Sequence, residues 1–221
     1  MTLALVVVGL LVVHSLVTNL WFTDRWYVPV NLATAALLVA LVGPDGLGLG
    51  AGWAAVVVGG AGALVVVVVL ALLASVPATR RFLADQRMAG VDLRGTVWRA
   101  GVRIPLGTVV LEEVAFRGVL PSLMSPVAAA VLFGLWHVAP TARTLDVNGV
   151  ALSRRARLVA VAGAVLFTTV VGLVFWHLRL ATGSVLAPAL VHIAANSGGT
   201  VAAFVVLRSD QRQRRRNCFQ T

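Results

Sequence analysis

The only two glutamates of the chain, Glu112 and Glu113, lie in an apolar stretch beside Arg117. A charge at the centre of a bilayer costs about 2.5–3.5 kcal/mol on insertion scales, so such a cluster needs water, partners or a function. Glu113 and Arg117 are four positions apart and can pair on one helix face. We therefore expect Glu112 to be the free carboxylate, suited to remove a proton from water as a general base. The alternative is an internal salt bridge with a structural role only.

Two histidines occur at the same helical spacing. His137 follows Phe133 by four positions, and His192 precedes Asn196 by four. Each pair therefore shares one helix face. These side chains could complete a site around Glu112, or they could bridge helices by hydrogen bonds that contribute about 0.6 kcal/mol each in membranes.

The cofactor requirement stays open at this point. Glu112, His137 and His192 could bind Zn²⁺ with a fourth position open to water. The same residue types could also work without a metal, with carboxylate-activated water and an oxyanion hole formed by asparagine and histidine. The only cysteine, Cys218, allows neither an intrachain disulfide nor a cysteine metal site.

The other polar residues in apolar stretches are weaker candidates. We expect interface or packing roles for His14 and His177, and the sequence offers no chemical context for Asn31 or Asn148. Several protease classes lack support, because the chain contains neither His-Glu-x-x-His nor Gly-x-Ser-x-Gly. Its aspartates also lie outside the apolar windows.

The elements that position these residues must be membrane helices. Hydrophobic residues make up 59% of the 221 residues, and the mean hydropathy is +0.95. Apolar windows close to the length that spans a bilayer fall at 2–22, 27–43, 51–76, 104–122, 125–141, 156–177 and 185–207. The sequence predicts an all-α, polytopic transmembrane bundle of about seven helices, within a range of six to eight.

Arginine placement predicts the topology. The net charge of +10 comes from 18 arginines, which gather between apolar runs rather than in a nucleic-acid-binding motif, so we expect no nucleic-acid partner. The segment 78–103 is predicted to be an amphipathic surface helix on the cytoplasmic face. A single transmembrane domain over 1–207 and a basic cytoplasmic tail over 208–221 place the N-terminus outside and the C-terminus inside, in what we interpret as a bacterial cytoplasmic membrane.

The three motifs resemble the signature of the CPBP family, which includes CAAX prenyl endopeptidases and bacterial bacteriocin-processing or immunity proteins. The matching residues are Glu112-Glu113-Val114-Ala115-Phe116-Arg117, Phe133-x-x-x-His137 and His192-x-x-x-Asn196, in the order of the family, preceded in the last case by Thr182 to Pro188. The resemblance covers about 104–200. The N-terminal helices match only the general architecture.

The resemblance implies an intramembrane endopeptidase that cleaves a hydrophobic or membrane-tethered substrate. Glu112 would activate the hydrolytic water, His137, His192 and Asn196 would complete the site and hold the oxyanion, and Glu113 with Arg117 would brace the helix beside Phe133. The main alternative is a non-catalytic immunity or scaffold protein. A proton-coupled transporter is disfavoured because no internal repeat is visible. No oligomeric state is indicated.

Overall fold

The computed structural model describes residues 2–20 and 24–218 and is helical without strands in these ranges. The helices are α1 (Thr2–Leu20), α2 (Asp24–Val42), α3 (Trp53–Ser75), α4 (Pro77–Arg80), η1 (Gln86–Met88), α5 (Leu93–Trp98), η2 (Arg99–Val109), α6 (Val110–Glu113), η3 (Val114–Val119), α7 (Leu120–Leu123), α8 (Pro126–Trp136), α9 (Val138–Val147), α10 (Arg154–Thr182) and α11 (Leu186–Cys218). The predicted all-α class is confirmed. Residues 21 and 22 of the first predicted window and residues 219–221 of the predicted tail lie outside the described residues.

One long helix, from α5 to α7, carries the glutamates through the middle of the molecule. Asp92 begins it as an N-cap that accepts a hydrogen bond from the Gly95 backbone N–H. The segments η2 and η3 have the wider π-helical turn, which is rare and occurs frequently at functional sites. Pro105, which has no backbone N–H, lies within η2. The helix ends where Met124 becomes extended.

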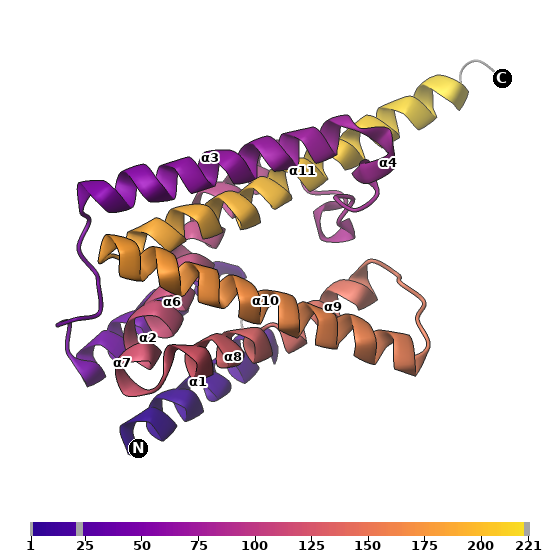
Figure 1. Ribbon diagram of the computed structural model, residues 1–221. Coiled ribbons are helices and arrows are strands. Elements are labelled where there is room, and N and C mark those ends of the chain that lie inside the picture. Colours follow the sequence, from indigo (N-terminus) through magenta and orange to yellow (C-terminus); the bar gives the residue numbers. More distant parts are fainter. Residues whose placement is uncertain (1, 21–23, 219–221) are drawn as a thin grey trace.

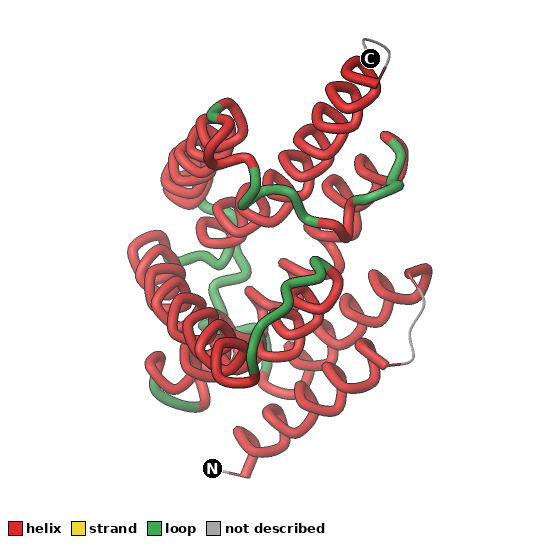
Figure 2. Tube along the Cα trace, turned by 90° about the vertical axis from the view of Figure 1, so that its right-hand side faces the viewer, coloured by secondary structure: helices red, strands yellow, loops and turns green. Residues whose placement is uncertain are grey.

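The other long helices surround this central helix in two layers (Figure 1). In one layer α3 packs along α11, and in the other α8 packs along α10. Viewed after a quarter turn, several loops lie in the middle of the molecule, between groups of helices (Figure 2). The central helix contacts α2 and α11, and it also contacts α8 and α10 through η3. Helices from both halves of the sequence therefore enclose Glu112.

A glycine allows α3 and α11 to approach closely. A Cβ atom added to Gly59 would lie 2.8 Å from both Cα and O of Ala187, whereas one added to Gly60 would meet nothing within 4 Å. Gly59→Ala should therefore destabilise the protein by about 1–3 kcal/mol through overpacking, while Gly60→Ala should leave the melting temperature near the wild-type value. Thermal unfolding of both variants in detergent tests this difference. Equal melting temperatures would mean that α3 and α11 do not pack through Gly59.

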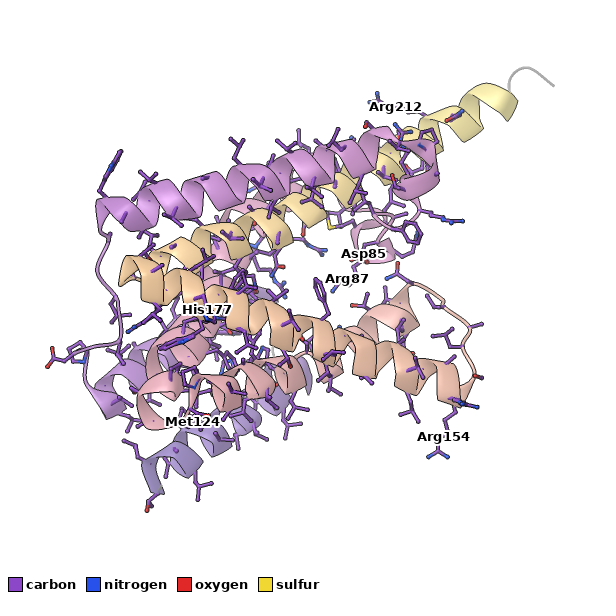
Figure 3. All side chains as sticks on the ribbon, viewed as in Figure 1. Asp85, Arg87, Met124, Arg154, His177 and Arg212 are labelled. Atoms are coloured by element: carbon purple, nitrogen blue, oxygen red, sulfur yellow. The ribbon has the colours of Figure 1, made fainter. Side chains whose placement is uncertain are left out.

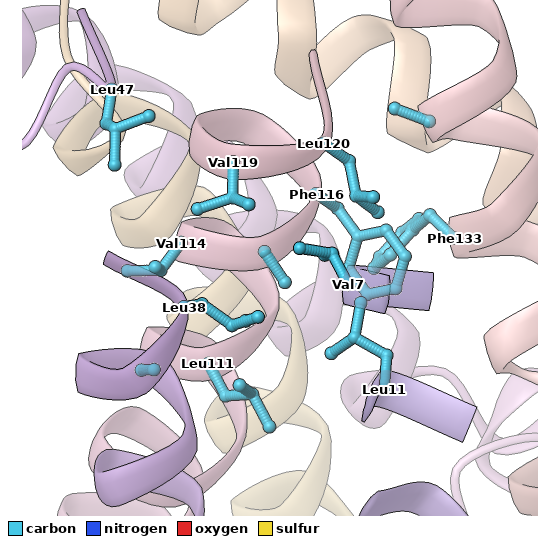
Figure 4. Close-up of a cluster of buried hydrophobic side chains, with 13 residues drawn as sticks. Val7, Leu11, Leu38, Leu47, Leu111, Val114, Phe116, Val119, Leu120 and Phe133 are labelled. Carbon is cyan, nitrogen blue, oxygen red and sulfur yellow. The ribbon is translucent and has the colours of Figure 1, made fainter. Parts of the chain in front are cut away.

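The apolar core lies between the N-terminal helices and the central helix. It includes Val7 and Leu11 of α1, Leu38 of α2, and Leu111 and Phe116 of the central helix, all buried (Figure 4). Each fully buried side chain of this size contributes about 1.5–3 kcal/mol in water. The contribution is smaller in a bilayer, because lipid tails are as apolar as the core. Packing here fixes α1 and α2 against the helix that carries the glutamates.

The described residues include four helices that are long and apolar enough to cross a membrane: Arg25–Val42, Trp53–Ser75, Arg154–Thr182 and Leu186–Gln213. A shorter apolar helix covers Thr2–Thr18. The protein is therefore an integral membrane protein. Each of the seven predicted windows contains a helix, although the predicted ends differ from the observed ends by several residues.

The arginine-rich segment 78–103 is not the single amphipathic helix that its pattern predicts. It contains α4, the short η1 and the beginning of the central helix. The interruption has local causes, since Asp85 caps η1 by accepting from the Arg87 N–H and Gly90 adopts a positive φ of 75°. Arg87, Arg154 and Arg212 nevertheless lie toward the same end of the bundle, opposite Met124 (Figure 3). We call this the arginine-rich end.

The predicted helix 125–141 is also divided. Ser125 caps α8, Trp136 ends it, and α9 continues from Val138 to Val147. The backbone turns at His137, with φ −85° and ψ −1°. Pro140 lacks the N–H that would bond to the Trp136 carbonyl in a continuous helix. His137 therefore lies at a break between helices rather than within one.

Candidate active site

Glu112 is buried, with 6% of its surface exposed, and its two oxygens have different surroundings. Oε1 accepts a hydrogen bond of 3.0 Å from Trp136 Nε1. Oε2 lies 3.6 Å from His192 Nε2 and has no hydrogen-bond partner in the described part of the chain. The carboxylate is thus held on one side, and its other side faces a group that can exchange a proton with it.

Glu113 contacts both His192 and Arg117. Its Oε1 accepts a hydrogen bond of 2.7 Å from His192 Nδ1, and its Oε2 lies 3.4 Å from Arg117 Nε. The predicted pairing of Glu113 with Arg117 is confirmed. Because a carboxylate oxygen can only accept, His192 Nδ1 donates to Glu113, and its Nε2 is the ring nitrogen that faces Glu112. Arg117, Glu113, His192 and Glu112 therefore form one electrostatic chain.

Arg117 is held by aromatic rings as well as by Glu113. Its guanidinium carbon lies 3.9 Å from the Phe133 ring centroid and 5.0 Å from that of Phe175. The side chain is 1% exposed, and neither Nη atom has a hydrogen-bond partner among the described residues. Cation–π attraction is strongest for such a desolvated cation. Phe133 and Phe175 therefore both contact the buried guanidinium.

His137 is half-buried and is oriented by the backbone. Its Nδ1 donates a hydrogen bond of 2.8 Å to the carbonyl of Phe133, and the two rings meet edge to face at 4.6 Å. This bond leaves Nε2 as the nitrogen that can accept a proton or a hydrogen bond. The predicted sharing of one face by Phe133 and His137 is confirmed.

A cavity of about 520 Å³ brings the predicted residues together. Glu112, His137 and Asn196 line it, as do Arg87, Arg99 and Arg103 toward the arginine-rich end. Its volume is within the range of ordinary ligand sites. His192 is not part of the lining and lies buried against both glutamates. Three of the four predicted catalytic residues therefore line one cavity. The fourth, His192, lies outside the lining and contacts Glu112.

The described side chains do not form the Zn²⁺ ligand set that the sequence suggested. No group of three or more His, Cys, Asp or Glu side chains that could hold a metal ion occurs within residues 2–20 and 24–218. Glu112 Oε1 and His192 Nδ1 are engaged by Trp136 and Glu113, and Glu112 Oε2 lies 3.6 Å from His192 Nε2.

Three cavity residues were not singled out from the sequence as parts of the site. Trp136 donates to Glu112, and His14 and Asn31 join the lining from α1 and α2. Trp136 is adjacent to the histidine motif, and the other two are polar residues within apolar windows; these were the available signals. His177, by contrast, is exposed and bonds to the Leu173 carbonyl, outside this site.

Asn148, another residue without context in the sequence, connects the end of α9 to η1. It accepts from the Gln86 N–H and donates to Asp85 Oδ1 at 3.2 Å. Burial opposes ionisation of Asp85, but the hydrogen bonds and charge of Arg87 outweigh it and hold the Asp85 pKa below its ordinary value. Asp85 is therefore an anion at neutral pH, and it pairs with Arg87.

A comparison with family models matches residues 94–198 to the Rce1-like family, described as type II CAAX prenyl endopeptidase Rce1-like. The match contains all three motifs and confirms the resemblance to the CPBP family. No curated protein and no solved structure matches the chain. Helices α1 to α3 lie outside the matched residues.

Proposed function

Because residues 94–198 match the Rce1-like family of type II CAAX prenyl endopeptidases, a family of proteases, we propose that this protein is an intramembrane endopeptidase that hydrolyses its substrate with water activated by Glu112. One observation carries the proposal. A buried carboxylate within a membrane-embedded bundle lines a cavity of about 520 Å³ together with an imidazole and an amide.

The reaction begins with a water molecule in the cavity beside Glu112. The carboxylate takes one proton as the water oxygen attacks the scissile carbonyl carbon, and His137 Nε2 accepts the second hydrogen bond of that water. The Asn196 amide donates to the developing oxyanion. The tetrahedral intermediate collapses when the C–N bond breaks and the proton from Glu112 passes to the leaving amine.

His192 supports this proton transfer. Its Nε2 faces Glu112 Oε2, and its Nδ1 is bonded to Glu113. The proton taken from water can therefore be shared between Oε2 and Nε2, with the resulting positive ring balanced by Glu113. This role differs from the oxyanion role expected from the resemblance, because His192 is not part of the cavity lining.

The surroundings favour a hydrophobic or membrane-tethered peptide. A second, mainly apolar cavity of about 290 Å³ shares Ser15 and Trp136 with the first. An apolar segment of the substrate would occupy this second cavity, which is lined by α1. We place the arginine-rich end in the cytoplasm by the positive-inside rule, in a bacterial cytoplasmic membrane.

The test is cleavage of a quenched fluorogenic library of hydrophobic peptides by the purified protein in detergent. We expect endoproteolytic products, and in ¹⁸O-labelled water we expect one ¹⁸O atom in each new carboxyl group. His177→Ala, which changes an exposed histidine outside the site, should cleave as well as the wild type. A folded wild-type protein that cleaves no peptide, in detergent or in liposomes, would favour the immunity or scaffold function instead.

A further inference from the structure

The hydrogen bond from Trp136 to Glu112 is supported by helices outside the matched residues 94–198. We infer that Trp136 is a positioning residue for Glu112, and that His14 and Asn31, from α1 and α2, hold the Trp136 ring in place. The inference rests on the proposed function and extends it, because it assigns a role to N-terminal helices that the family match does not cover.

The Trp136 indole can act on Glu112 only as a hydrogen-bond donor. Tryptophan Nε1–H is a donor and never an acceptor, so the 3.0 Å contact requires Glu112 Oε1 to accept. This bond leaves Oε2 directed at His192 Nε2. Without the bond the carboxylate is free to rotate, and the orientation that proton transfer requires is populated for less of the time.

Two rings hold the indole plane. His14 stacks on Trp136 with ring centroids 6.3 Å apart and an interplanar angle of 13°, while Phe116 meets it edge to face at 5.7 Å. Phe116 belongs to the same central helix as Glu112, so its position follows from the motif helix. His14 comes from α1 and needs its own support.

That support comes from α2. Asn31 Nδ2 donates to the Tyr27 carbonyl at 2.6 Å, which leaves Asn31 Oδ1 to accept from His14 Nε2 at 3.2 Å. His14 Nδ1 lies 2.9 Å from Thr34 Oγ1. Both nitrogens of this buried ring are therefore engaged within the protein. His14 is thus a fixed surface for stacking and not a second base.

The kinetic test is Trp136→Phe, assayed with the library peptide that the wild type cleaves fastest. Removing one hydrogen bond to a charged group should lower kcat by about 10- to 100-fold, while KM stays near the wild-type value. Trp53→Phe, at a site that is 79% exposed, is the matched control and should leave kcat unchanged. A KM increase with kcat unchanged would overturn the positioning role.

The support of the Trp136 ring by His14 is tested with His14→Ala, alone and together with Trp136→Phe. The loss of one aromatic contact should lower kcat by about 2- to 10-fold. If His14 acts through Trp136, the double variant should be no slower than Trp136→Phe alone. Full multiplication of the two effects would overturn the inferred path through the indole.

A spectroscopic readout separates this inference from the proposed function. In ¹⁵N-labelled protein in micelles, the Trp136 indole resonance, assigned by its loss in Trp136→Phe, should shift in both Glu112→Ala and His14→Ala but not in His177→Ala. An unmoved resonance in Glu112→Ala would overturn the inference even if cleavage depends on Glu112. A shifted resonance in a protein without peptidase activity would support the contacts of Trp136 with His14 and Glu112 and would reject only the proposed function.

Discussion

Glu112→Gln is expected to abolish cleavage while the protein stays folded. Glutamine has nearly the same shape and its Oε1 can still accept the Trp136 hydrogen bond, so the packing around position 112 is preserved. It cannot remove a proton from water, and the loss of a general base typically lowers the rate by about 10²- to 10⁴-fold. We expect kcat to fall by this amount and the melting temperature to stay near the wild-type value.

The measurement is cleavage of the best library peptide, with thermal unfolding in the same detergent as the folding control. Glu113→Gln is the informative neighbour, because it alters the residue that orients His192 and pairs with Arg117. It should lower both activity and stability. Wild-type cleavage by a well-folded Glu112→Gln variant would remove Glu112 from the mechanism and with it the proposed function.

Arg117→Met is expected to cause the largest loss of stability. Arg117 and Glu113 are each 1% exposed and form a buried ion pair. Removing one partner leaves an uncompensated buried charge, which typically costs about 3–5 kcal/mol. The double variant Glu113→Gln with Arg117→Met contains no such charge, and the glutamine can still accept from His192 Nδ1. It should therefore be more stable than Arg117→Met alone.

Unfolding by added SDS, followed by circular dichroism, measures these differences. The control is Arg157→Met, which breaks an exposed pair with Asp146 whose side chains are 41% and 59% exposed. Water and ions screen such a pair, so its loss should produce no measurable change. If the double variant is as unstable as Arg117→Met, the cost arises from the packing of Arg117 against Phe133 and Phe175 rather than from its charge.

The long apolar helices and the pairing of Glu113 with Arg117 could be predicted from the sequence, because both depend on spacing along one helix. The division of the chain at His137 and the interruption of the segment 78–103 were not predicted, because the apolar pattern continues through both. There, single caps and turns such as those at Asp85 and Gly90 outweigh the apolar pattern. Periodicity reports the average character of a segment and not where one hydrogen bond ends it.

The contacts of Trp136 with Glu112 and His14 could not be predicted from sequence spacing, because they join helices that are distant along the chain. Trp136 and Glu112 are 24 positions apart, and His14 is further from both along the chain. Spacing rules describe one face of one helix and say nothing of which neighbouring helix covers it. The role of α1 and α2 in the site therefore became visible only once their packing against the central helix was known.

The widened turns of the central helix determine which residues share the cavity. Arg103 and Glu112 are nine positions apart, and in a regular α-helix nine positions make about two and a half turns, which would point the two side chains in opposite directions. Both nevertheless line the same cavity, and η2, which covers most of the span between them, turns through a smaller angle per residue. The π-helical stretch thus acts as a phase shift in the helical repeat. It lets one continuous helix present a cation and a carboxylate to the same volume.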